Sequence, residues 1–137
     1  MSDFPITIFH NPACGTSRNA LEMIRASGYA PAVVEYLQAG WTRPQLESLL
    51  SAMAASPRDV LRIKGTPAEA MGLIDEGIGD DVLLDAMVAE PVLVNRPIVV
   101  TPKGTRLCRP SETVLELLER TPDFFTKEDG EVVRLKS

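Results

Sequence analysis

The chain has 137 residues, 45% of them hydrophobic, and a formal charge of −5. Length and composition predict one globular domain with an apolar core. The acidic balance disfavours nucleic-acid binding, which usually needs a basic face, and the apolar runs are too short to span a membrane. The start of the sequence lacks the basic region of a secretory signal. We therefore expect a cytoplasmic protein whose two cysteines stay as free thiols.

The first forty residues predict a β-α-β unit. Residues 6–9 are typical of a short buried strand, and residues 18–27 have helical spacing that Gly28 ends. Residues 32–36 form a second strand candidate. Two strands joined through a helix are expected to pair in parallel.

The middle of the chain is predicted to be helical. Thr42 is placed to cap one helix, residues 57–62 form a short one, and Asp80 or Asp81 is expected to cap another. The apolar residues expected on the buried faces of the two longer helices are Leu46, Leu49, Leu50 and Met53, and Leu83, Leu84, Met87 and Val88.

After Pro91 the pattern returns to strands. Residues 98–100 and 105–108 flank a turn sequence at 101–104, which predicts a hairpin. Residues 111–119 are predicted to form a helix capped by Ser111. The polar tail after Pro122 is expected to be a surface extension.

This order of elements predicts an α/β fold with a thioredoxin/glutaredoxin-like core. The core is a βαβ–ββα arrangement around a mixed four-stranded sheet, formed by residues 1–40 and 91–120. Residues 41–90 form a helical insertion and residues 121–137 a C-terminal extension. All belong to one predicted domain, 1–137, which we expect to be a monomer.

Cys14 is the main candidate for a reactive group. It lies between the first strand and the first helix, where free backbone N–H groups and the helix dipole favour an anion. Such a position lowers the pKa of a thiol and also attracts an oxyanion substrate. A buried structural cysteine in a turn is the alternative interpretation.

The residues after Cys14 exclude two familiar kinds of site. Ser17 stands where a C-x-x-C dithiol would have its second cysteine, and Ala20 stands where a phosphatase-like C-x₅-R loop would have its arginine. Cys14 would then be a single nucleophile. Its electrons would come from an outside thiol or from Cys108.

His10 is the only histidine and ends the first strand. An imidazolium turned toward the sulfur would stabilise the thiolate. A histidine that merely shapes the turn through hydrogen bonds is an equally good interpretation. One histidine and two cysteines that are distant in the sequence give no metal-ligand pattern, and no metal is expected.

Two arginines directly precede prolines, Arg96 before Pro97 and Arg109 before Pro110. The residue before a proline is extended, which can aim its side chain away from the strand. Guanidinium groups bind tetrahedral oxyanions bidentately. The position of Pro97 at the start of a strand also fits a cis-proline beside a thioredoxin-type active site.

Three segments, 10–19 (HNPACGTSRN), 94–112 (VNRPIVVTPKGTRLCRPSE) and 125–130 (FTKEDG), closely resemble the glutathione- and glutaredoxin-dependent arsenate reductases of the ArsC family. The resemblance covers nearly the whole chain. It implies a thioredoxin-like fold with a helical insertion and an arsenate reductase that serves arsenic detoxification. It also implies arsenate as substrate, glutathione as co-substrate, glutaredoxin as partner and no tightly bound cofactor.

The resemblance also implies roles for individual residues. Cys14 matches the nucleophile, and His10 and Ser17 match residues that lower its pKa. The remaining matches are to arsenate-binding arginines, Arg62, Arg96 and Arg109, and to an anion-binding loop, Asn11, Gly15, Thr16 and Ser17. Cys108 matches a position that the family does not need as a catalytic thiol.

Two other functions remain open from the sequence. A regulator of the Spx type, which binds RNA polymerase, shares this fold but commonly carries C-x-x-C where this chain has Cys14 and Ser17. A related thiol enzyme with another substrate is the third possibility. The segment around Arg109 favours arsenate reduction over both.

Overall fold

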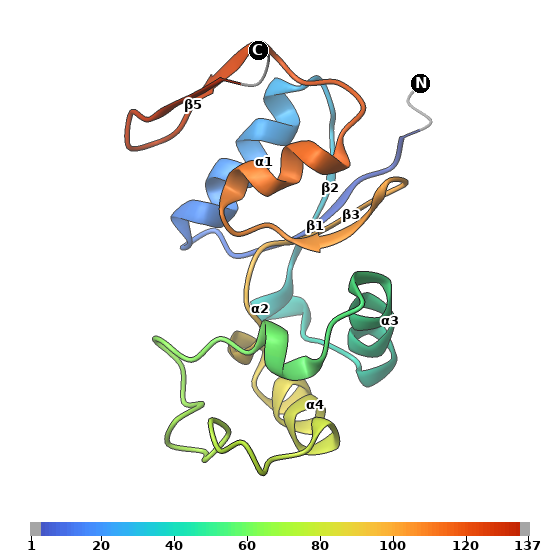
Figure 1. Cartoon of the computed structure of the whole chain (residues 1–137), viewed down its shortest axis with the longest axis vertical. Helices are drawn as coiled ribbons and strands as arrows, with labels where there is room; N and C mark the ends of the chain where they lie inside the picture. Colours follow the sequence, from blue (N-terminus) through green and yellow to red (C-terminus); the bar gives the residue numbers. More distant parts are fainter. Residues whose placement is uncertain (1–3, 135–137) are drawn as a thin grey trace. The chain divides into compact units, whose positions relative to one another are not determined.

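The computed structural model describes residues 4–134, which form parts of two compact units (Figure 1). The first unit is built from the two ends of the chain, up to Glu35 and from Arg96 onward. The second unit is the intervening segment, Tyr36–Asn95.

The first unit contains a four-stranded sheet. Its strands are β1 (Thr7–His10), β2 (Ala32–Glu35), β3 (Ile98–Thr101) and β4 (Gly104–Leu107), in the order β2-β1-β3-β4. Strand β1 pairs in parallel with β2 and antiparallel with β3, which is antiparallel to β4. The predicted mixed sheet with βαβ–ββα order is confirmed.

The centre of this sheet is apolar on both faces. Ile8 of β1 pairs with Val99 of β3 on one face, Phe9 pairs with Ile98 on the other, and all four side chains are buried. Central strands covered on both faces favour β-branched residues, which accounts for the apolar runs in the sequence. The hairpin turn before Gly104 is also as predicted.

Two helices pack against each other beside the sheet, α1 (Gly15–Ala26) and the 3-10 helix η3 (Ser111–Leu117), coloured blue and orange in Figure 1. Both contribute to one hydrophobic core. Its helical members are Ala20, Leu21, Met23, Ile24, Val114 and Leu117.

The predicted cap of the second of these helices is wrong. Pro110, and not Ser111, is the N-cap of η3. The Ser111 hydroxyl lies inside the first turn and donates to the Glu112 carboxylate at 3.0 Å, so it caps no backbone group there. The helix is also shorter than expected and ends at Leu117.

The C-terminal segment, expected only as a polar extension, forms a hairpin of β5 (Phe124–Thr126) and β6 (Val132–Arg134). Phe125 and Val133 face each other across the hairpin and pack against the core of the first unit. Phe124 and Val132 are exposed. The period-two alternation is therefore present in the segment, but it is only three residues long in each strand.

The second unit is mainly helical. Its helices are α2 (Tyr36–Ala39), α3 (Arg43–Met53), η1 (Pro57–Val60), α4 (Asp80–Ala89) and η2 (Pro91–Leu93). Arg43 of α3 forms ion pairs with Asp81 and Asp85 of α4, which link the two longest helices. Arg58 donates hydrogen bonds to three loop carbonyls, those of Leu73, Asp75 and Ile78.

Two details of α4 differ from the prediction. Its N-cap is Gly79. Asp80 and Asp81 lie within the first turn, where their negative charges interact favourably with the positive end of the helix dipole. Val88 is 37% exposed and not buried. The buried face is centred on Leu83 and Met87, so Val88 falls at its edge.

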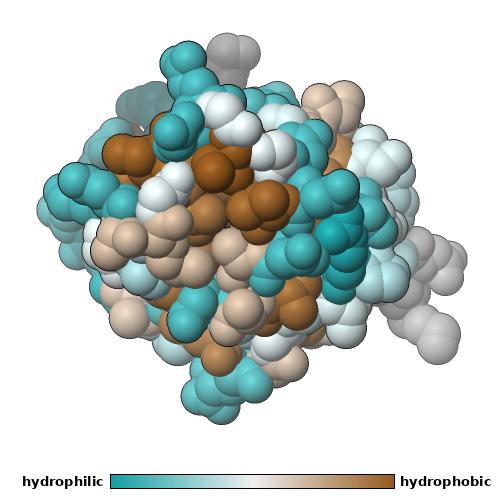
Figure 2. Space-filling model, turned by 90° about the horizontal axis from the view of Figure 1, so that it is seen from below, coloured by the Kyte–Doolittle hydropathy of each residue, from teal (hydrophilic) through white to brown (hydrophobic). Residues whose placement is uncertain are grey.

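Six large apolar side chains of the second unit are exposed, namely Leu37, Ile63, Met71, Ile74, Val82 and Val88. Figure 2 shows one face of the molecule on which hydrophobic residues gather among hydrophilic ones. Among residues 4–134, the structure contains no helix that is both long and apolar enough to cross a membrane.

The predicted cap of α3 is confirmed as a full capping box. The Thr42 hydroxyl accepts from the Gln45 backbone N–H at 3.2 Å, and the Gln45 side chain accepts from the Thr42 backbone N–H at 3.4 Å. These bonds satisfy N–H groups that have no partner within the helix.

We predict that Thr42→Ala lowers the free energy of unfolding by about 1 kcal/mol, because the cap is lost. Thr42→Ser, which keeps the hydroxyl, should stay close to the unsubstituted protein. Urea unfolding followed by circular dichroism measures both. Equal stability of Thr42→Ala and Thr42→Ser would contradict the role of the cap.

Candidate active site

Cys14 is the N-cap residue of α1, at the end of the loop that follows β1. The loop is folded by Asn11, which is buried. Its side-chain oxygen accepts from the Ala13 N–H at 2.9 Å, and its carbonyl accepts from the Cys14 N–H at 3.0 Å. The helix begins at Gly15, three residues earlier than the sequence spacing predicted, so the thiol lies directly at its N-terminus.

The Cys14 side chain is only 7% exposed, and this burial by itself raises the pKa of the thiol. Four groups act in the opposite direction: the Ser17 backbone N–H, the Arg96 charge, the Arg109 side chain and the Thr16 backbone N–H. Their sum prevails, so the pKa of Cys14 lies below that of an ordinary cysteine. The local structure therefore favours a thiolate.

Arg109 makes the direct side-chain contact with the sulfur. Its Nη1 lies 3.8 Å from Cys14 Sγ and donates a second hydrogen bond, of 2.9 Å, to the Arg96 carbonyl. Arg96 and Arg109 thus lie next to each other although they are thirteen positions apart in the sequence. The guanidinium of Arg109 bridges the nucleophile and the backbone at Arg96.

Sheet register explains why these residues meet. Phe9 of β1 and Leu107 of β4 both pair with Ile98, the first residue of β3. The end of β1, the start of β3 and the end of β4 therefore lie at the same edge of the sheet. Arg96 precedes β3 and Arg109 follows β4 at this edge.

Both arginines precede cis-prolines. The Arg96–Pro97 peptide bond is cis, as the sequence predicted, and the Arg109–Pro110 bond is cis as well, which was not foreseen. The Cys108 N–H donates to the Pro97 carbonyl at 2.8 Å, which joins the two segments next to the arginines.

His10 faces Ser17, with its Nδ1 2.6 Å from the serine Oγ. Burial lowers the pKa of His10, and the charges of Arg25 and Arg18 lower it further against the opposing effect of Glu35. These effects favour the neutral imidazole. Of the two interpretations offered by the sequence, this geometry favours the hydrogen-bonded histidine that shapes the turn.

Ser17 is fully buried and connects the loop with the helix. Besides its bond with His10, its Oγ accepts from the Asn11 N–H at 3.1 Å. These bonds hold the first turn of α1 so that the Ser17 N–H faces the sulfur. Gly15 and Thr16, predicted with Asn11 as the anion-binding loop, are half-buried in that same turn.

Comparison with known proteins identifies the family of this chain. A family model described as the ArsC family matches residues 9–117. The chain belongs to the ArsC family. It is 54% identical to arsenate reductase ArsI1 of Synechocystis sp. over 97% of this chain and 93% of that protein. It is 55% identical to an arsenate reductase of Escherichia coli over 93% and 92% of the two chains.

A solved structure titled as an arsenate reductase from Vibrio cholerae superposes on this chain with a TM-score of 0.81. The sequences are 35% identical, and the alignment covers 85% of this chain and all of that one. The thioredoxin-like fold expected from the sequence is thereby confirmed for this member of the ArsC family.

Arg62 lies in the second unit, directly after η1 and its C-cap Leu61. Its N–H donates to the Leu93 carbonyl at 2.8 Å, and its side chain donates to the Lys64 carbonyl at 3.2 Å. Its assignment to the anion site rests on the ArsC-family resemblance and stays a prediction.

Cys108 is completely buried within the apolar core, and burial raises the pKa of its thiol to about 12. Its sulfur donates to the Arg106 carbonyl at 3.7 Å. A thiol that remains protonated is a poor nucleophile. Of the two electron sources that the sequence left open, the outside thiol is therefore favoured.

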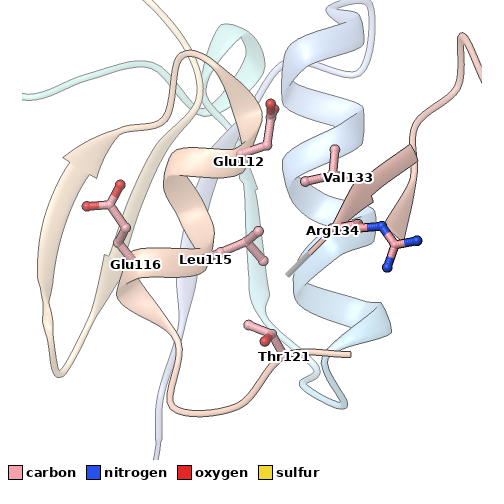
Figure 3. Close-up of a pocket in the computed structure, with 6 residues that line it drawn as sticks. All are labelled: Glu112, Leu115, Glu116, Thr121, Val133 and Arg134. Atoms are coloured by element: carbon pink, nitrogen blue, oxygen red, sulfur yellow. The ribbon is translucent and has the colours of Figure 1, made fainter. Parts of the chain in front are cut away.

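A cavity of about 330 Å³ in the first unit shares no lining residue with the surroundings of Cys14. Figure 3 shows the residues that line it: Glu112, Leu115, Glu116, Thr121, Val133 and Arg134. Glu112 is paired with Lys127 and Glu116 with Arg106, so both carboxylates are already neutralised. In residues 4–134, no three His, Cys, Asp or Glu side chains gather as metal ligands.

The contrast between the two cysteines predicts the stoichiometry of alkylation. The native protein should react rapidly with one equivalent of iodoacetamide, at Cys14, and with two only after unfolding. Mass spectrometry of intact protein measures the uptake, and Cys14→Ser is the control that should take up none while folded. Equal reactivity of both thiols in the native state would contradict the assignment.

Proposed function

We propose that the protein reduces arsenate to arsenite, with the Cys14 thiolate as nucleophile. The observation that carries the proposal is the guanidinium of Arg109, 3.8 Å from the Cys14 sulfur at the N-terminus of α1. This arrangement puts an activated thiol and a binding site for an oxyanion at the same position. Relatives named arsenate reductases, 54–55% identical over more than nine tenths of their length, support this substrate.

The physical difficulty of the reaction is the approach of two anions. A thiolate must attack an arsenate that itself carries negative charge, so positive charge has to screen the repulsion. Arg96 and Arg109 supply it beside the sulfur, and the backbone N–H groups of the first helical turn add to it. Arg62 is proposed as a third cation from the resemblance alone.

We propose the following steps. The Cys14 sulfur bonds to arsenic, one arsenate oxygen leaves as water after protonation, and a thiol–arsenate adduct forms with arsenic still As(V). The sulfur of glutathione then bonds to the Cys14 sulfur. The S–As bond breaks with its electron pair on arsenic, so As(III) leaves as arsenite.

The product of that step is a disulfide between Cys14 and glutathione. A glutaredoxin thiol then takes over the glutathione and returns Cys14 to the thiolate. Two features of the chain support an outside donor: Ser17 occupies the position of a nearby resolving thiol, and Cys108 is buried. We propose this cycle as a cytoplasmic arsenic detoxification reaction.

His10 and Ser17 act in this proposal through the backbone. The imidazole bonds with the Ser17 hydroxyl, and the Ser17 N–H lowers the pKa of Cys14. The non-enzymatic alternative, a polymerase-binding regulator, is disfavoured because such a role requires neither a stabilised thiolate nor a guanidinium in contact with it.

The test is arsenate-dependent oxidation of NADPH in the presence of glutathione, glutaredoxin and glutathione reductase. We predict turnover by the native protein and none by Cys14→Ser. Arg96→Lys keeps the positive charge but should still lose activity, because a lysine cannot form the two parallel hydrogen bonds that a guanidinium makes to an oxyanion. Arg106→Lys, an exposed arginine paired with Glu116, is the matched control that should stay active. Turnover by Cys14→Ser would refute the proposal.

A further inference from the structure

Arg18, one turn into α1 after Cys14, forms a two-pronged ion pair with Glu128. Its Nε donates to Glu128 Oε2 at 2.7 Å and its Nη2 to Glu128 Oε1 at 2.9 Å. The third guanidinium nitrogen, Nη1, donates to the Pro12 carbonyl at 2.8 Å. One side chain thus joins the loop of the nucleophile to a residue 110 positions away.

The Glu128 carboxylate lies on a turn that is held by backbone hydrogen bonds. Glu128 lies between β5 and β6, where the Lys127 N–H donates to the Glu131 carbonyl and the Gly130 N–H to the Lys127 carbonyl. The Glu128 N–H itself donates to the side chain of Asn19 on α1, at 3.1 Å. The hairpin tip is therefore attached to the first turns of α1 by both backbone and side chain.

The pair lies beside the residue that follows the nucleophile. A Cβ atom at Gly15 would stand 3.6 Å from Glu128 Oε1 and 3.7 Å from Arg18 Nη2. The pKa of Arg18 is raised, chiefly by its hydrogen bonds to Glu128 and also by the charge of Cys14. The positive charge of Arg18 therefore acts on the Cys14 side of the helix start, and Glu128 offsets part of it.

We propose that Arg18 and Glu128 are a positioning pair that sets how much positive charge acts on Cys14. Arg18 holds the Pro12 carbonyl and stabilises the thiolate, and Glu128 orients the guanidinium while limiting its effect on the sulfur. The C-terminal hairpin, which carries Glu128, then contributes to the reactivity of Cys14. This inference rests on the proposed role of Cys14 as a thiolate nucleophile.

Opposite effects of the two partners follow from their charges. Arg18→Gln removes a cation near the sulfur and should make the thiolate less stable. Glu128→Gln keeps the size of the side chain but leaves Arg18 unneutralised, and should make the thiolate more stable. The double variant removes both charges and should return toward the native value. A purely structural role would make both single variants change in the same direction, and the double variant no better than either.

The experiment measures the rate of Cys14 alkylation by iodoacetamide in the full chain, at a pH below the midpoint of its pH profile. Arg18→Gln should react more slowly and Glu128→Gln faster, each by roughly two- to fivefold, the range expected for one exposed charge near the start of a helix. Added salt should shrink both changes. Glu22→Gln, which removes a carboxylate from an exposed pair on the same helix, is the control and should leave the rate unchanged.

Unchanged rates in both single variants, or changes in the same direction, would overturn the inference. If Arg18→Gln fails to fold, faster alkylation of Glu128→Gln alone still supports it, and an unchanged or slower rate overturns it. The measurement involves no arsenate, so its failure is distinguishable from a failure of the proposed reductase activity in the coupled assay.

Discussion

The site depends on the stability of one anion, the thiolate of Cys14. Cys14 is nearly buried, and burial alone would keep its sulfur protonated and unreactive. Oriented N–H groups of the first helical turn and the guanidiniums of Arg96 and Arg109 reverse that preference. An environment that stabilises a thiolate also stabilises a bound oxyanion, so one set of groups can serve both reaction partners.

The fold supplies these groups from segments that are distant in the sequence. The register of β1, β3 and β4 brings the end of one strand, the start of the next and the end of the third to one edge of the sheet. The loop with Cys14, the arginine before β3 and the arginine after β4 meet there. Cys108 lies only one residue before Arg109, but its thiol is buried in the core. Burial there raises the pKa of the thiol to about 12, whereas the pKa of Cys14 is lowered.

Local patterns were sufficient to predict most of the framework. The apolar spacing of α1, the Thr42 capping box and the cis bond before Pro97 are all present in the structure. Errors arose where a residue type allows several local roles. Asp80 and Asp81 lie inside the first turn of α4 rather than capping it, and the Ser111 hydroxyl bonds to its neighbour Glu112.

Other features depend on tertiary packing and leave little trace in the sequence. The hairpin after Pro122 is too short for its alternation to stand out, and it becomes evident only because Phe125 and Val133 join the core. No periodicity links Arg18 with Glu128. The direct contact of Arg109 with the sulfur likewise follows from strand register and not from spacing, although the resemblance had already marked that arginine.

The most direct measurement of the central claim is a pH titration of the thiolate by its ultraviolet absorbance, taken as the difference between the native protein and Cys14→Ser. The account predicts a midpoint below that of an ordinary cysteine, and a higher midpoint in Arg109→Ala, because the guanidinium that contacts the sulfur is gone. A native midpoint at or above the ordinary value, or one that is unaltered in Arg109→Ala, would contradict it.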